Sequence, residues 1–247
     1  MSGAGSPTLS IEGKVATLTL RRPDEHNRID ADDPQAVSQH LQEIVKHPDV
    51  AVLVLTGTGE KTFCAGYTLT QISSRLDQRF EDMLDQIEHL PIPTICAMNG
   101  SAYGGGTDLA MSCDFRIGVH GSRLFMPAAK FGLHYYPGGL RRFVERIGPA
   151  ATKKIFLTAQ SIDAEELLRI GYLTELVERE ALDGKVRAYV ESILLCERDA
   201  VKSMKQHIDA LALGTWSEAA GRAAYEASLQ STATAERLTA LNRAREA

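Results

Sequence analysis

A triplet of glycines, Gly104–Gly106, constrains this chain more than any other feature of its sequence. It stands between an apolar run at residues 93–98, which predicts a strand, and a helical segment that continues to Met111. Glycines at such a joint let the backbone approach a ligand closely, and the free N–H groups of a first helical turn favour negative charge. Asp108 lies in that turn. The segment therefore predicts an anion-binding bend with an acid/base group beside it.

A second bend of similar composition lies earlier in the chain. Residues 50–56 form an apolar run that predicts a buried strand, and the segment 61–67 follows it. This segment also ends in small residues, Ala65 and Gly66, which leave a backbone N–H exposed. Backbone donors of this kind stabilise a developing oxyanion. The second bend therefore also predicts a free main-chain donor.

The spacing of apolar residues predicts an α/β chain. Strand-like runs occur at residues 9–12, 15–20, 50–56, 94–98, 115–119, 123–125 and 175–177. Helical periods lie between them, at residues 32–46, 73–89, 104–111, 140–147 and 150–159. After residue 180 only helical patterns follow, at residues 181–195, 200–212, 216–229 and 233–245. We therefore expect a ββα core over residues 1–180 and a helical region over residues 181–247.

The bulk composition excludes several classes of protein. The 247 residues are 44% hydrophobic and 24% charged, with a net charge of −5, which argues against a nucleic-acid surface. No apolar run approaches the roughly 20 residues of a membrane-spanning helix, and residues 1–7 do not resemble a signal peptide. The four cysteines lack metal-ligand spacing and predict reduced thiols of a cytoplasmic protein. We also expect no metal site.

The two bends resemble the two halves of the signature of the crotonase superfamily, the enoyl-CoA hydratases and isomerases. The first half is Phe63–Gly66, and the second runs from Gly104 to Asp114. The similarity extends over nearly the whole chain. Other landmarks that resemble the family are Arg22-Pro23, Asn27, Phe131-Gly132, Gly138-Gly139, Leu157–Ala159, Ala164 and Gly171.

The resemblance implies a spiral of ββα turns with a C-terminal helical region that packs between subunits, as a homotrimer or a homohexamer. It implies an acyl-CoA thioester as substrate, so coenzyme A belongs to the substrate and no separate cofactor is expected. Two backbone N–H groups would hold the thioester oxygen while an enolate forms. By position these belong to Ala65 and Gly105, with Gly104 beside them.

The resemblance makes Asp108 the counterpart of one of the two glutamates with which a family hydratase activates and delivers water. Its side chain is one methylene shorter than glutamate. The second glutamate would stand just after Pro127, where this chain has Ala128. A single Asp108 would then have to serve as both acid and base.

Other polar residues near these bends are candidates for the site. The stretch 126–139 resembles the family's methylmalonyl-CoA decarboxylase branch, in which a tyrosine at the place of Tyr135 contacts the leaving carboxylate. A phenol is protonated at neutral pH and could supply that hydrogen bond. His134 and Tyr67 are candidate contacts to substrate, and the family contacts coenzyme A in the stretch that holds His26 and Arg28.

Three functions are therefore open. The first is a hydratase or isomerase that stabilises an enolate and uses Asp108 as its single acid/base. The second is a decarboxylase of a malonyl-type acyl-CoA that uses Tyr135. The third is a non-catalytic acyl-CoA-binding or assembly protein.

Overall fold

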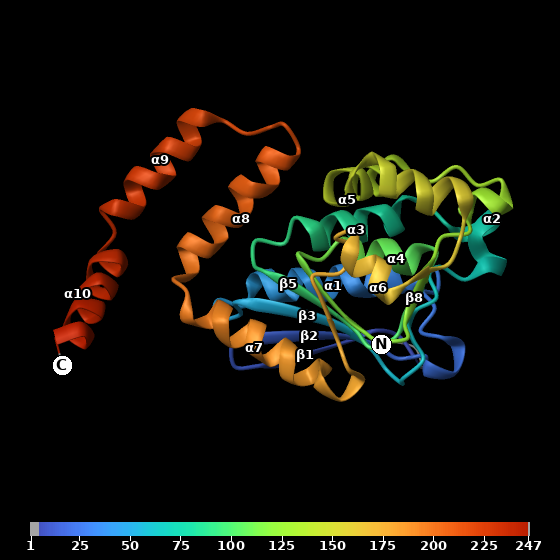
Figure 1. Ribbon diagram of the computed structural model, residues 1–247, viewed down its shortest axis with the longest axis horizontal. Coiled ribbons are helices and arrows are strands. Elements are labelled where there is room, and N and C mark those ends of the chain that lie inside the picture. The colour runs from blue at the N-terminus through green and yellow to red at the C-terminus, as the bar shows by residue number, and fades with distance from the viewer. Residues whose placement is uncertain (1–4, 247) are drawn as a thin grey trace.

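The computed structural model describes residues 5–246 and forms two β-sheets with helices packed around them (Figure 1). The larger sheet has six strands in the order β1-β2-β3-β5-β7-β10. Only β1 runs antiparallel, against β2. These strands are β1 (Thr8–Glu12), β2 (Val15–Leu20), β3 (Val52–Gly57), β5 (Thr94–Met98), β7 (Phe115–Val119) and β10 (Glu175–Val177).

The smaller sheet has four short strands in the order β4-β6-β8-β9. They are β4 (Thr62–Cys64), β6 (Ser101–Tyr103), β8 (Arg123–Phe125) and β9 (Ile162–Asp163). Strands β4, β6 and β8 are parallel, so their carboxyl ends meet at one edge. This edge carries both glycine-bearing bends, since Ala65 follows β4 and Gly104 follows β6.

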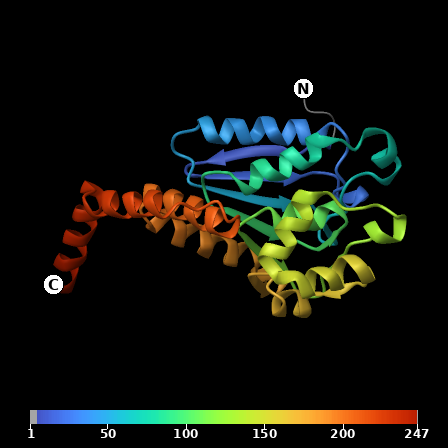
Figure 2. The ribbon, with the colours of Figure 1, turned by 90° about the horizontal axis from the view of Figure 1, so that it is seen from above.

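The helices cover both faces of the larger sheet (Figure 2). One face packs into a continuous core with α1 (Asp33–Lys46), α3 (Gln78–Glu88), α4 (Gly105–Met111) and α5 (Pro137–Thr158). The other face packs against α7 (Leu182–Leu195) through a separate apolar cluster that includes Val52, Ile95 and Val186. The remaining helices are α2 (Ile72–Arg75), α6 (Ala164–Arg169), α8 (Arg198–Ala212), α9 (Glu218–Leu229) and α10 (Thr232–Glu246), with short 3-10 turns at Pro23–Glu25, Leu69–Gln71, Ala128–Phe131 and Arg179–Ala181.

The α/β class and the C-terminal helices are confirmed. The pair of helices predicted at residues 140–159 forms α5, which is interrupted at Gly148, where φ is 75° just before Pro149. The helix predicted at residues 73–89 is divided into α2 and α3. Helix α3 begins after Asp77, because the Asp77 side chain caps it by accepting a hydrogen bond from the Arg79 amide.

The C-terminal helices leave the core after α7. Helices α8, α9 and α10 extend away from the sheets (Figure 1), and α8 is held to the core by an ion pair between Lys205 and Asp114. The division of the chain into two regions after residue 180 stays a prediction. Helix α7 lies beyond that boundary and packs on the larger sheet. Within residues 5–246, no helix is both long and apolar enough to cross a membrane. The predictions for residues 1–4 and 247 lie outside the described residues.

Candidate functional site

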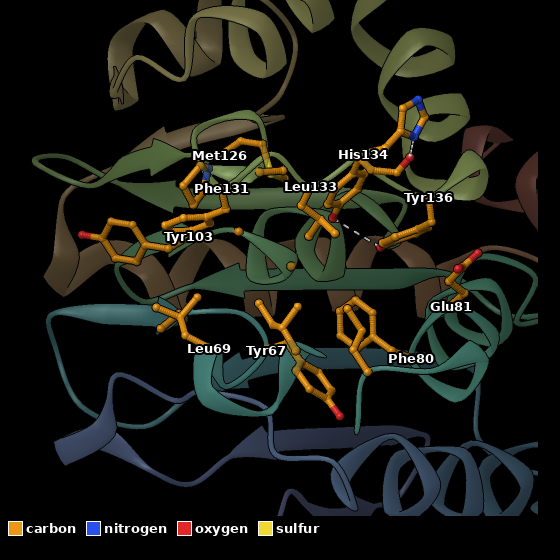
Figure 3. Close-up of a pocket in the computed structure, with 18 of the residues that line it drawn as sticks. Tyr67, Leu69, Phe80, Glu81, Tyr103, Met126, Phe131, Leu133, His134 and Tyr136 are labelled. Atoms are coloured by element: carbon orange, nitrogen blue, oxygen red, sulfur yellow. Dashed lines mark hydrogen bonds between the residues drawn. The ribbon is translucent and has the colours of Figure 1, made fainter. Parts of the chain in front are cut away.

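A pocket of about 520 Å³ opens at the carboxyl ends of the small parallel strands (Figure 3). Both glycine-bearing bends form part of its wall, the first through Ala65 and Tyr67 and the second through Gly104 and Gly105. Most of the remaining wall is apolar or aromatic. It includes Leu69, Ile72, Leu76, Phe80, Tyr103, Phe125, Met126, Ala128, Phe131, Leu133, Tyr135 and Tyr136.

The backbone amides of Tyr67 and Gly105, which lie on this wall, have no hydrogen-bond partner among the described residues. Tyr67 forms a parallel bridge with Ile29. The Ile29 amide donates to the Gly66 carbonyl, and the Ile29 carbonyl accepts from the Thr68 amide. In such a ladder the intervening residue turns its own N–H to the opposite side. The Gly105 N–H is free because it opens helix α4.

The same geometry corrects one prediction. The amide of Ala65 was expected to be the first oxyanion donor, but it donates a 2.9 Å hydrogen bond to the carbonyl of His26. It is therefore not available to a ligand. The free donor of the first bend is Tyr67, two residues further along, and Gly105 is retained as the second. The sequence could not distinguish them, because the bridge to Ile29 decides which amide faces the pocket.

The two amides lie close to one another. A Cβ built on Gly105 would lie 3.6 Å from the Tyr67 nitrogen, and one built on Gly66 would lie 2.7 Å from the Gly105 nitrogen. Gly66 also has a φ of 80°, in the region that favours glycine. Only glycine at position 66 therefore leaves space for an acceptor next to the Gly105 amide.

Asp108 is fully buried and is not part of the pocket wall. Arg142 donates to both of its carboxylate oxygens, from Nε at 2.9 Å and from Nη2 at 3.0 Å, and the Tyr136 hydroxyl donates to Oδ2 as well. Direct contact between Asp108 and a substrate, as the sequence predicts, does not fit this arrangement. Tyr136 stands between the carboxylate and the pocket.

Arg142 is the centre of a buried ion-pair network. Besides Asp108, it contacts Asp85 at 2.6 Å and Glu88 at 3.0 Å, and its side chain is fully buried. Burial by itself lowers the pKa of Arg142, but Asp108, Tyr136 and Glu88 outweigh that effect and raise it. Burial likewise raises the pKa of Glu88, yet Arg141 and Arg142 hold it below its ordinary value. The network fixes the Asp108 carboxylate in place.

Tyr135 and Tyr136 stack on one another with ring centroids 4.4 Å apart. The Tyr135 hydroxyl donates to the Tyr136 hydroxyl at 3.3 Å, and Tyr136 donates in turn to Asp108. Burial raises the pKa of both phenols well above 10, and the nearby Asp108 carboxylate adds to the effect. Both tyrosines are therefore protonated at neutral pH.

Gly139 in the first turn of α5 makes this arrangement possible. A Cβ there would lie 2.3 Å from the Tyr135 ring and 2.8 Å from Oδ2 of Asp108. The predicted role of Tyr135 as a donor to substrate competes with its bond to Tyr136, because a phenol has one hydrogen to donate.

The remaining predicted residues are divided between the pocket and other surfaces. Gly104, Ala128 and His134 line the pocket, and His134 Nδ1 lies 2.7 Å from the Tyr135 carbonyl. Tyr67 also lines it, while its hydroxyl donates to the Arg75 carbonyl.

His26 and Arg28 do not line this pocket. His26 contacts the Thr62 hydroxyl, and Arg28 pairs with Glu25 and Asp30. The guanidinium proposed for coenzyme A is therefore already paired with two carboxylates of its own chain.

Cys64 lies beside the first bend but cannot act as a nucleophile in this state. It is fully buried, and burial raises the pKa of its thiol to about 12. Only the thiolate attacks. The sulfur accepts a hydrogen bond from the Gly66 amide at 3.3 Å.

The sequence analysis did not identify Tyr136, Arg142, Phe80 or Glu81 as residues of the site. No motif marks Tyr136, Phe80 or Glu81, and Arg142 belongs to a pair of basic residues of the kind that usually lies in solvent. The spacing Gly105 to Asp108 could not reveal a partner more than 30 residues away.

The chain matches the family model described as enoyl-CoA hydratase/isomerase over residues 10–241. It is 34% identical to a short-chain-enoyl-CoA hydratase of Clostridium acetobutylicum, over 81% of this chain and 80% of the relative. It is 33% identical to a crotonyl-CoA hydratase of Syntrophomonas wolfei, over 80% and 78% of the two chains. A crystal structure of an enoyl-CoA hydratase from Bacillus anthracis superposes with a TM-score of 0.85 at 25% identity and covers 96% of each chain.

Proposed function

The chain belongs to the enoyl-CoA hydratase/isomerase family, a family of enzymes that act on acyl-CoA thioesters, and we propose that its pocket binds the thioester group between two main-chain amides. The donors are the N–H groups of Tyr67 and Gly105. The single observation that carries the proposal is that both amides lack a partner within residues 5–246 and are adjacent on one wall of the pocket.

Two such donors favour a reaction that passes through an enolate. When a proton leaves or a nucleophile adds next to the thioester, negative charge develops on its oxygen. Fixed backbone donors stabilise that charge, and each is typically worth about 3 kcal/mol in the transition state. Hydration of a conjugated double bond and migration of a double bond both use this stabilisation.

The pocket favours an uncharged acyl group. Its wall is largely apolar, and among the described residues that line it there is no lysine or arginine, whereas Asp77 and Glu81 are present. A second carboxylate on the acyl group, as in a malonyl-type thioester, would meet like charge without a cation to pair with it.

This arrangement favours hydration or isomerisation over decarboxylation. Tyr135, the proposed contact of a leaving carboxylate, donates its hydrogen to Tyr136. Tyr136 is the phenol that the Asp108–Arg142 pair orients at the pocket wall. We propose that Tyr136 orients the water molecule or the reacting carbon atoms, and that Asp108 acts through Tyr136.

We propose a homotrimer or homohexamer assembled through the C-terminal helices. Helices α8 to α10 leave large apolar side chains exposed, and these support the proposal. They include Met204, Ile208, Leu211, Tyr225, Leu229, Leu238 and Leu241. A cytoplasmic location is proposed from the four free cysteines.

A panel of acyl-CoA thioesters followed by liquid chromatography, which separates isomers, and mass spectrometry tests the reaction class. We expect a short enoyl-CoA to gain one water, or its double bond to move without a change of mass. Loss of carbon dioxide from a malonyl-type thioester would instead support the decarboxylase. Binding without any of these conversions would support the non-catalytic alternative.

A further inference from the structure

Glu81 is the one carboxylate of the pocket wall that no arginine or lysine neutralises within the described chain. Its neighbours differ. Asp77 caps α3 and pairs with Arg79, while Asp85 and Glu88 pair with Arg142. Glu81 lines the pocket from the first turns of the same helix. A half-buried, unpaired carboxylate facing a cavity is available to a ligand.

Phe80 holds this part of α3 against the oxyanion wall. A Cβ on Gly105 would lie 2.8 Å from the Phe80 ring, so the ring fills the space beside that glycine. The same ring packs edge-on against Tyr67 and Tyr136, with centroid distances of 5.7 and 6.1 Å. Glu81 follows directly in the chain, and Figure 3 shows its carboxylate at the end of the pocket where Tyr136 lies.

The surroundings of Glu81 make it a better proton acceptor than an ordinary surface glutamate. Burial raises its pKa, and the neighbouring charges of Asp85 and Asp82 add to the shift. Gln78 on the same helix and Arg142 on α5 lower the pKa of Glu81, but they do not cancel the rise. Asp108, in contrast, already accepts three hydrogen bonds and has no contact with the pocket.

We propose that Glu81 is the general base and acid of this site, supplying from α3 the carboxylate that the chain lacks at Ala128. The proposal rests on the enolate chemistry proposed above. In hydration, Glu81 takes a proton from water as the water oxygen bonds to the β-carbon of the enoyl thioester. The π electron pair of the Cα=Cβ bond moves toward the thioester oxygen, which Tyr67 and Gly105 hold.

The same carboxyl group then completes the reaction. Glu81 returns its proton to the α-carbon as the enolate electron pair forms the new C–H bond. Water has been added across the double bond, and Glu81 is again a carboxylate. In double-bond migration the group removes a proton from one carbon and delivers it to the other. Ala128, which lines the same pocket, brings no second carboxylate that would repel Glu81.

The test compares Glu81→Gln with Asp82→Asn in the full-length protein. Asp82 is the next residue of the helix, exposed and not itself part of the pocket wall, so the control removes one charge from the same helical turn while the Glu81 carboxylate stays in place. With crotonyl-CoA as substrate, Glu81→Gln should lower kcat about a hundredfold or more, since a positioned acid/base is typically worth about 10²–10⁴-fold. Asp82→Asn should stay within about twofold.

Three further readouts separate a chemical role from a structural one. Glu81→Gln should bind butyryl-CoA, which lacks the reactive double bond, as the unchanged protein does. The acidic limb of its pH profile of kcat/KM should disappear, because the carboxylate that must lose its proton for activity is gone. Formate added to a Glu81→Ala variant should restore part of kcat.

The proposal is overturned if Glu81→Gln keeps full kcat while the unchanged protein hydrates crotonyl-CoA. It is also overturned if the variant loses activity only together with butyryl-CoA binding. Failure of the unchanged protein to convert any enoyl-CoA would overturn the proposed function itself, and the two failures are therefore distinguishable.

Discussion

The Tyr136 hydroxyl donates its hydrogen bond to Oδ2 of Asp108, the carboxylate that Arg142 holds from the other side. Asp108 is fully buried, whereas Tyr136 reaches the pocket. The carboxylate beside the second glycine bend therefore influences a bound thioester through a phenol. This relationship separates two roles, with Tyr136 in contact with the ligand and Asp108 as its positioning residue.

Replacing Tyr136 with phenylalanine should impair turnover more than binding. The variant keeps the ring that packs on Phe80 and Tyr135 but loses the hydroxyl. We expect kcat for an enoyl-CoA to fall about tenfold to a hundredfold. The control is Tyr67→Phe, because the Tyr67 hydroxyl faces the Arg75 carbonyl and not the ligand. Equal losses in both variants would contradict the role of Tyr136.

Replacing Asp108 with asparagine should destabilise the protein. Arg142 is fully buried, and removal of one partner leaves its charge poorly compensated. Breaking a buried pair typically costs about 3–5 kcal/mol, which denaturant unfolding would measure. The double variant Asp108→Leu with Arg142→Met should recover part of that stability but not turnover. Unchanged stability of Asp108→Asn would contradict a positioning role.

A methyl group at Gly66 should block the oxyanion site. The new Cβ would lie 2.7 Å from the Gly105 nitrogen, where the thioester oxygen is expected. We expect kcat/KM to fall about a hundredfold or more, as when an oxyanion donor is removed. Gly121→Ala is the matched control, since its φ of 77° is nearly the same but no atom lies within 4 Å of its Cβ. Similar kinetic losses in both variants would show that backbone strain, and not crowding, is responsible.

Cys64 should resist alkylation in the folded protein. Its pKa of about 12 leaves almost no thiolate at pH 8, and its side chain is fully buried. Iodoacetamide should therefore modify the exposed Cys196 and leave Cys64, Cys96 and Cys113 unmodified, with turnover unchanged. Peptide mass mapping measures the sites. Rapid modification of Cys64 with loss of activity would support the nucleophile that we exclude.

Acid should weaken the ion pairs of Glu88. Its pKa in the folded state is held below the ordinary value of 4.5, so the stabilisation is fully present above about pH 4.5 and is lost as pH falls through the folded pKa. The free energy of unfolding should therefore decline more steeply below pH 4.5 in the unchanged protein than in Glu88→Gln. Parallel pH dependences would contradict the contribution of Glu88.

Much of the fold was predictable from local patterns. Apolar runs located the long strands, and the glycine triplet located the start of α4, because these signals depend on residues near one another in the chain. Strands β8 and β10 were predicted, but β4 and β6, which also have three residues each, were missed, since so short a run often shows no clear alternation. Their pairing sets the edge that holds the pocket.

Several residues of the site were predictable from the sequence, but the role of each residue was not. Gly105 and Asp108 were identified because a glycine and a carboxylate three residues apart are visible in the sequence. The donor was misplaced at Ala65 because only the distant segment with His26 and Ile29 decides which amide is occupied. Arg142 and Glu81 come from α5 and α3, and no local spacing relates them to Asp108 or Ala128.

The frequency of the thioester carbonyl stretch of a bound acyl-CoA tests the central claim most directly. Difference infrared spectroscopy with a ¹³C-labelled thioester isolates this band. If the Tyr67 and Gly105 amides both donate to the oxygen, the band of bound butyryl-CoA should move to lower frequency than in water, and Gly66→Ala should reverse the shift. A bound thioester whose carbonyl frequency matches that in water would contradict the account.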